Sequence, residues 1–212
     1  MDTILIKENL KNYYNQEAEL RNSNTIKPDW KIEVREKFCS LIKKENKKTL
    51  LELGAGPGYD SQFFMNNGLT VTAIDISSEM VKNCKDKGID AYELDFYNLS
   101  SLGKRFDCIY AMNTILHVPK DDLPHVLNEI NSVLEVNGLF YMGLYGGQDI
   151  EKEHIISEVS DAPRFFVFNS KSYLEIVLEK HFQIISFESL YTDKINTHGD
   201  IDTFHSITMQ KK

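Results

Sequence analysis

Cysteine is scarce in this sequence, which has only three among its 212 residues. They lie far apart, form no C-x-x-C pair and have no histidine at the spacing of a zinc ligand. This pattern argues against a disulfide framework and predicts no metal site. It favours three reduced, buried thiols at Cys39, Cys84 and Cys108, as is usual for a cytoplasmic protein.

Long apolar runs are missing as well. No stretch approaches the roughly 18 to 20 apolar residues that cross a bilayer, and the most apolar one, residues 108–112, ends at Asn113. The first ten residues carry Asp2, Lys7 and Glu8 and lack the apolar core and cleavage site of a secretory signal. We therefore expect a soluble, cytoplasmic protein with no membrane partner.

Positive charge is in deficit, with 24 Lys and Arg against 32 Asp and Glu and a formal net charge of −8. This is the wrong sign for a protein whose affinity depends on neutralising phosphates, so nucleic acid is not an expected partner. The acidic excess lies mainly in residues 49–149, whereas residues 1–48 are mildly basic. An anionic small molecule near the N-terminal segment therefore remains compatible with the charge.

No internal repeat, low-complexity tract or Pro/Gly/Ser-rich linker divides the chain. With 42% hydrophobic residues it can build one well-buried core. We expect a single domain over residues 1–212, present as a monomer or a homodimer. It would comprise a helical cap or lid at 1–48, a ligand-binding core at 49–145, and a final segment at 146–212.

Short apolar runs alternate with helical patterns from residue 49 onward. The runs predict strands at 49–53, 70–74, 89–94, 106–112 and 139–144, and the periodicity predicts helices at 4–21, 31–45, 59–67, 77–87 and 121–136. We expect the last of these helices to be capped by Asp121 and to stop at Asn137-Gly138. Such alternation predicts a parallel sheet with helices on both faces, and ligands bind at the carboxyl ends of its strands.

The rhythm changes after Gly146. A helix expected at 172–180 leads to an apolar run at 182–190, and a polar loop with Gly199 leads to another run at 203–209. Two strands joined without a helix pair as an antiparallel hairpin. The sequence therefore predicts an α/β, Rossmann-like, mostly parallel sheet that ends in one reversed strand.

The segment from Leu50 to Gly58 reads LLELGAGPG and links an expected strand to an expected helix. Its three alternate glycines let the backbone turn sharply and approach a ligand closely, and the start of the helix offers unpaired N–H groups. A nucleotide-sized ligand suits this loop. A turn that only redirects the chain would also explain the glycines.

Acidic residues follow the next two strands. Asp75 ends the second strand, 21 residues after Gly54, where a carboxylate can accept both hydroxyls of a ribose. Asp95 and Phe96 follow the third, where an acid can accept from an exocyclic amine and a ring can cover adenine. Helix capping also explains such acids, and a capping-box pattern begins near Ser77. Agreement between three successive strand ends favours a nucleotide site.

These motifs, with residues 106–111 leading to Leu116-His117, resemble the successive motifs of class I S-adenosylmethionine-dependent methyltransferases. The resemblance covers residues 49–145 in motif order. The seven-stranded sheet of that family, with its reversed last strand, fits the expected hairpin. The resemblance implies that S-adenosylmethionine is the cofactor and that its methyl group passes to a small-molecule acceptor by in-line displacement.

The resemblance also implies roles along the cofactor. Glu52 and the glycine turn would hold the methionine end, Asp75 the ribose, Ile76 an adenine face, and Asp95 with Phe96 the adenine amine and ring. The backbone near Met112 and Asn113 would receive the ammonium group. The expected cofactor-binding residues are Glu52, Gly54, Ala55, Gly56, Gly58, Asp75, Ile76, Asp95, Phe96, Met112, Asn113, Tyr14 and Arg21.

Tyr14 and Arg21, both in the first expected helix, suit a lid that excludes water, with Arg21 pairing the methionine carboxylate. Packing of that helix against the sheet is the competing explanation. His117, beyond the fourth strand, is the candidate catalytic base, since an unperturbed histidine titrates near pH 6.5. Packing beside Pro119 at a helix entry would also explain it.

Residues 149–168 are the expected acceptor wall, with an apolar surface from Phe165, Phe166 and Phe168. A strand or a core face would equally explain each of these phenylalanines.

Two other functions remain open. A nicotinamide-dependent oxidoreductase would carry G-x-G-x-x-G, whereas residues 54–58 read G-x-G-x-G, and Glu52 before them would repel a pyrophosphate. A non-catalytic S-adenosylmethionine-binding protein is the alternative that is not an enzyme.

Overall fold

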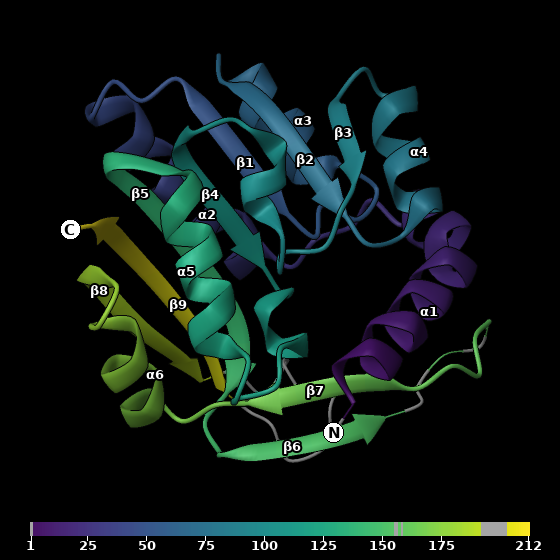
Figure 1. Ribbon diagram of the computed structural model, residues 1–212. Helices are drawn as coiled ribbons and strands as arrows, with labels where there is room; N and C mark the ends of the chain where they lie inside the picture. Colours follow the sequence, from purple (N-terminus) through teal and green to yellow (C-terminus); the bar gives the residue numbers. More distant parts are fainter. Residues whose placement is uncertain (1, 155–156, 158, 192–202) are drawn as a thin grey trace.

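The computed structural model describes residues 2–154, 157, 159–191 and 203–212. Its centre is a seven-stranded sheet (Figure 1). The strands in sheet order are β3 (Asp90–Glu93), β2 (Thr70–Asp75), β1 (Thr49–Leu53), β4 (Phe106–Met112), β5 (Leu134–Gly146), β9 (Thr203–Lys211) and β8 (Phe182–Tyr191). The first five run parallel, and β9 is antiparallel to both β5 and β8. The predicted mostly parallel sheet with a reversed last strand is confirmed; the Gly199 loop lies outside the described residues.

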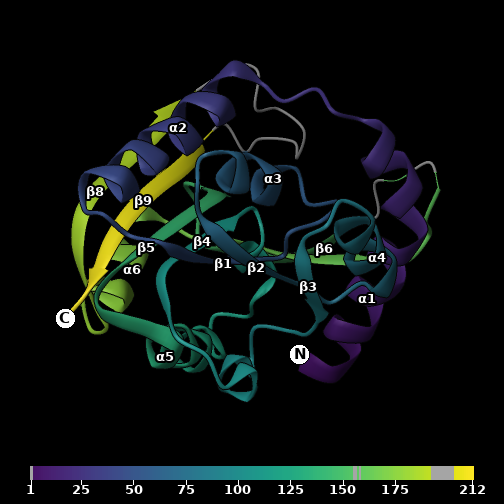
Figure 2. The same ribbon diagram turned by 90° about the horizontal axis from the view of Figure 1, so that it is seen from above.

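Helices cover both faces of the sheet, as predicted. They are α1 (Thr3–Ser23), α2 (Asp29–Lys44), α3 (Tyr59–Asn66), α4 (Ser78–Asp86), α5 (Leu123–Val133) and α6 (Lys171–Leu178), with 3-10 turns η1 (Leu99–Leu102) and η2 (Ile115–His117). Figure 2 shows α2 and α3 on one face and α5 and α6 on the other. Alternate residues of each strand point to opposite faces, so Leu50 packs with α2 while Leu51 packs with α5. The central strands are therefore buried on both sides.

The boundary between α5 and β5 differs from the prediction of a helix at 121–136. The helix covers only Leu123–Val133, Asp121 lies before it, and no side chain caps its first turn. Asn137 and Gly138 lie inside β5, where Asn137 adopts φ +59° and the register against β4 shifts. The asparagine and glycine thus form a bulge within a strand rather than the end of a helix.

A second, two-stranded sheet was not predicted. Its strands, β6 (Ile150–His154) and β7 (Arg164–Phe168), are antiparallel. Every residue of β7 is buried, and α1 packs on it through Ile6 and Leu10. In Figure 1 this sheet and α1 lie at the end of the main sheet towards which the arrowheads of β2, β3 and β4 point. Together they form a cap over the carboxyl ends of these strands.

None of the helices that the structure describes combines the length and the apolar character needed to cross a membrane.

Candidate functional site

A cavity of about 520 Å³ lies at the carboxyl ends of β1, β2, β3 and β4, under α1 and the segment that joins α1 to α2. This volume lies within the usual range for sites that enclose a small ligand. The cavity brings together the predicted site residues from all these strand ends. Those that line it are Tyr14, Arg21, Glu52, Gly54, Ala55, Gly56, Asp75, Ile76, Asp95, Phe96, Met112, Asn113 and His117.

The glycine loop after β1 has the left-handed backbone that its composition predicts. Gly54 adopts φ +62°, and a Cβ on it would lie 2.2 Å from Thr114 Oγ1. Gly56 adopts φ +55° and faces open space. Gly58, at the start of α3, does not line the cavity, because it packs against Ile89 and Cys84. The structure places Gly58 in the turn before α3, and its predicted contact with a ligand stays a prediction.

Asp75 ends β2 and is buried beside the glycine loop. One carboxylate oxygen accepts from the Gly56 N–H at 2.8 Å and the other from the Ser77 N–H at 2.9 Å. Burial raises the pKa of Asp75, and these backbone hydrogen bonds oppose that rise. Each oxygen has room for a further donor, so the carboxylate can accept two vicinal hydroxyls. Ser77 is the N-cap of α4, so Asp75 sits just before the cap.

The third strand end supplies an acid and aromatic rings. Asp95 accepts from the Tyr97 N–H at 2.9 Å and forms an ion pair of 2.5 Å with Lys7 of α1. Phe96 stacks on Tyr97, with ring centroids 5.6 Å apart. An acceptor beside a flat ring suits a planar ligand that carries an amine.

Glu52 is the most enclosed acid of the cavity, with 3% of its surface exposed. It accepts a hydrogen bond from the Ser61 hydroxyl. Burial, together with the negative charge of Asp60, raises the pKa of Glu52 well above its ordinary range. A cation in the cavity would favour its ionised form.

Asn113, directly after β4, adopts φ +55° and donates its N–H to the Gly143 carbonyl at 2.7 Å. The residue lines the cavity, and its side-chain oxygen is buried and has no hydrogen-bond donor within the part of the chain that the structure describes. A buried acceptor without a donor is unfavourable. A ligand with an N–H or O–H group would satisfy it.

Tyr14 and His117 form a pair across the cavity wall. The Phe165 carbonyl lies 2.6 Å from His117 Nδ1 and the Tyr14 hydroxyl 2.7 Å from Nε2. Because a carbonyl can only accept, Nδ1 carries the proton, so Nε2 of the neutral ring accepts from Tyr14. Burial raises the pKa of the Tyr14 hydroxyl, against the influence of Arg21 and Arg164.

Arg21 lies 5.1 Å from the centre of the Tyr14 ring and pairs with Glu17 at 3.2 Å. Both residues belong to α1 and line the cavity, in agreement with the prediction that this helix brings them to the site.

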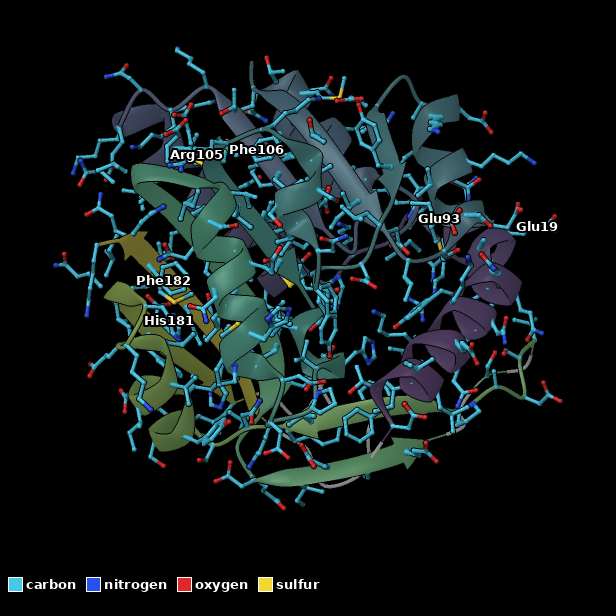
Figure 3. The ribbon with its side chains drawn as sticks, in the orientation of Figure 1. Glu19, Glu93, Arg105, Phe106, His181 and Phe182 are labelled. Carbon is cyan, nitrogen blue, oxygen red and sulfur yellow. The ribbon has the colours of Figure 1, made fainter. Side chains whose placement is uncertain are left out.

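Polar contacts tie α1 to the elements beside the cavity. Lys11 pairs with Glu93 at 2.5 Å, and Figure 3 shows Glu93 beside α1 while Glu19 points outward. The Ser77 hydroxyl donates to Asn15 at 2.7 Å. On its other side α1 makes the apolar contacts with β7.

None of the described residues of the predicted acceptor wall, 149–154, 157 and 159–168, lines the cavity, and residues 155, 156 and 158 of that wall lie outside the described residues. Phe165, Phe166 and Phe168 are buried in β7, where Phe165 packs on α1 and the other two join the main core. The sequence prediction missed the lysines Lys27 and Lys31, which do line the cavity. Their i, i+4 spacing around Pro28 was the only signal. Among the described residues there is no cluster of three or more potential metal ligands.

A family model for a methyltransferase domain matches residues 50–138. The chain is 36% identical over 95 residues to malonyl-[acyl-carrier protein] O-methyltransferase from Hamiltonella defensa, a match that covers 44% of this chain and 36% of that protein. A second relative, an uncharacterised protein from Methanocaldococcus jannaschii, is 25% identical, with 76% of this chain and 65% of that protein covered. The chain thus spans less than two thirds of both curated relatives.

Solved structures with the same fold include two methyltransferases. The 1,6-didemethyltoxoflavin-N1-methyltransferase of Burkholderia thailandensis is 16% identical with a TM-score of 0.71, covering 99% of this chain and 88% of that one. Magnesium protoporphyrin IX methyltransferase of Synechocystis PCC 6803, with bound S-adenosylmethionine, is 12% identical with a TM-score of 0.72, covering 100% and 98%. At these identities the likeness concerns the fold.

Proposed function

Because the chain belongs to the class I S-adenosylmethionine-dependent methyltransferases, we propose that it transfers the methyl group of S-adenosylmethionine to a small-molecule acceptor. One observation carries the proposal: Glu52, Asp75 and Asp95 line a single cavity from β1 and from the ends of β2 and β3. The cofactor offers a cationic methionine end, a ribose and an amine in that order, so each acid has a partner of matching chemistry.

The cavity residues fit this cofactor better than a dinucleotide. The buried oxygen of Asn113 would accept from the ammonium group of the cofactor, and the positive charge of the cofactor would favour the ionised form of Glu52. A pyrophosphate would bring negative charge beside Glu52 and Asp75, and the loop lacks the third glycine of the dinucleotide pattern. These features count against a nicotinamide-dependent oxidoreductase.

S-adenosylmethionine supplies a methyl group on a cationic sulfur, which leaves as a neutral thioether. The protein has to align the acceptor and, where the acceptor atom carries a proton, remove that proton. Tyr14 and His117 remove it together, because the Tyr14 hydroxyl takes the proton of the acceptor and passes its own to Nε2 of His117. The carbonyl of Phe165 keeps the ring in the tautomer that can accept it.

The names of related proteins support a small-molecule acceptor. The two solved structures named above are methyltransferases of a toxoflavin precursor and of magnesium protoporphyrin IX. We also propose a cytoplasmic location, because the three cysteines form no disulfide and the sequence has no long apolar run.

Calorimetric titration with S-adenosylmethionine, S-adenosylhomocysteine and NAD tests the proposal. We expect micromolar or tighter binding of the two sulfur compounds and none of NAD. Binding of NAD alone would refute the cofactor assignment. A screen with tritium-labelled methyl donor and small-molecule fractions then separates an enzyme from a binding protein. If the donor binds and no fraction is labelled, the protein binds the cofactor without catalysis.

A further inference from the structure

Lys31 lies in the first turn of α2, and its side chain reaches the cavity. Its ammonium group is 5.3 Å from the centre of the Trp30 ring and 5.7 Å from that of Tyr145. Tyr145 is near the end of β5, and Trp30 and Tyr145 both contact Phe204. The positive charge therefore sits against aromatic walls.

No carboxylate forms a salt bridge with Lys31 anywhere in residues 2–154, 157, 159–191 and 203–212. Asp60, an acid whose charge acts on Lys31, pairs with Lys27 and with Arg35, the latter at 2.7 Å. Burial, followed by the positive charge of Lys27, lowers the pKa of Lys31 to about 8, and the negative charge of Asp60 opposes this only in part. An amine that loses solvation without gaining an anion is destabilised in its charged form. A bound anion would reverse this.

The place of Lys31 along the sheet identifies which ligand the anion belongs to, a step that rests on the proposed function. The cofactor groups follow the strand ends, with adenine at β3, ribose at β2 and the methionine end at β1 and β4. Lys31 lies beside Tyr145 of β5, two strands beyond the glycine loop. Neighbouring strands are about 4.8 Å apart, so Tyr145 lies about 10 Å across the sheet from the glycine loop, on the side away from β2 and β3. That is the acceptor side of the transferred methyl group.

We propose that Lys31 binds an acidic group of the methyl acceptor, and that the acceptor is a small carboxylic acid or phosphate with an apolar body. The ammonium of Lys31 holds the anion, with Lys27 adding positive charge nearby. Leu20, Ile26 and Met112, apolar residues that line the same cavity, offer surface for the apolar part. The methyl group goes to a separate hydroxyl or amine, because a group that is already anionic does not need the Tyr14–His117 pair.

The test compares matched charged and uncharged probes on protein saturated with S-adenosylhomocysteine. The pairs are 3-phenylpropanoate with 3-phenylpropanamide, and phenyl phosphate with phenol, and calorimetry measures each affinity. We expect the wild type to prefer the anion of at least one pair by about tenfold. The pair that shows the preference distinguishes a carboxylate from a phosphate.

Three variants locate the preference. Lys31→Met should abolish it, and Lys31→Arg should retain it because the charge is kept. Lys37→Met is the matched control on the same helix, since Lys37 is exposed and pairs with Glu188. It should behave as the wild type. The affinity for S-adenosylhomocysteine should stay within about twofold in all three variants, which also verifies folding.

Two results would overturn the proposal. In one, the wild type shows no preference for either anion. In the other, Lys31→Met weakens S-adenosylhomocysteine binding about tenfold and leaves the anion preference intact. That result would show that Lys31 contacts the cofactor and not the acceptor. The titrations are repeated without S-adenosylhomocysteine. If the wild type binds the anions but does not bind S-adenosylhomocysteine, the anion site is supported and the proposed cofactor is refuted.

Discussion

The end of the cavity beside β2 and β3 is lined by acids that lie at the ends of these strands, whereas its other end, towards β5, is lined by lysines before and within α2. At the first end each acid accepts from the backbone N–H two residues ahead, Asp75 from Ser77 and Asp95 from Tyr97, and Asp75 also accepts from Gly56 of the loop after β1. At the second end Lys31 depends on residues distant in sequence, such as Tyr145. Short-range geometry therefore builds one end, and tertiary packing builds the other.

The difference also concerns charge. Asp75 and Asp95 suit hydroxyls and an amine, while Lys27 and Lys31 suit an anion. A ligand pair that spans the cavity needs a donor-rich part at one end and an acidic part at the other. Substitutions in the glycine loop, in the Tyr14–His117 pair and at single acids test this difference between the two ends of the cavity.

The largest effect is expected for Gly54→Ala. A Cβ there would lie 2.2 Å from Thr114 Oγ1, and the φ of +62° is already unfavourable for alanine. Strain and overpacking together should lower the free energy of unfolding by about 3 kcal/mol, measured by urea denaturation. Gly56→Ala is the control, since it has a similar φ of +55° and open space around it. It should lose only about 1 kcal/mol. Equal losses would show that the contact with Thr114 is unimportant.

The next effect is expected for Tyr14→Phe, which removes the hydroxyl that joins the cavity to His117. With an acceptor identified by the labelling screen, kcat should fall about a hundredfold, as is usual for loss of general base assistance. S-adenosylhomocysteine affinity should be unchanged. His117→Gln and the double variant should lose no more than Tyr14→Phe, because the two residues act in one path. Additive losses would separate their roles.

The smallest effect distinguishes Glu52 from Asp75. Glu52→Gln should weaken S-adenosylhomocysteine about tenfold, or 1.4 kcal/mol, and leave methylthioadenosine, which lacks the amino acid, unchanged. Asp75→Asn should weaken both compounds about tenfold, because both carry the ribose. Asp90→Asn is the control: Asp90 opens β3 at the opposite edge of the sheet and pairs with Lys104. If the two variants show the same profile, the assignment along the cavity is wrong.

The acids beside β2 and β3 lie at strand ends, where the sequence places them, for a physical reason. Asp75 and Asp95 follow apolar runs, and parallel strands bring their carboxyl ends to one edge, so each position follows from local pattern. Gly54 and Gly56 likewise have the left-handed backbone expected of a close approach. Gly58 has it too, but the residues behind it, Ile89 and Cys84, come from elsewhere in the chain and could not be foreseen.

The end of the cavity towards β5 and the cap were less predictable. Arg164–Phe168 reads as an apolar run, and only the pairing with β6 and the packing of α1 make it a buried strand outside the main sheet. Asn137 reads in the sequence as the end of a helix, because the same left-handed conformation ends helices and forms bulges. No sequence motif marks Lys31. Its lack of a salt bridge depends on the pairing of Asp60 with Lys27 and Arg35, which only the folded structure shows.

The contacts on the two sides of α1 differ in how easily water can replace them. Where α1 meets α4 and β3, side chains such as Lys11 and Asn15 make polar contacts, and exchanging each of these for a contact with water changes the free energy by only about 0.5–1.5 kcal/mol. The apolar contacts of Ile6 and Leu10 with β7 are kept if these elements move together. Solvent can therefore enter along one polar seam, and a spent ligand can be exchanged for a fresh one while the core of the sheet stays dry.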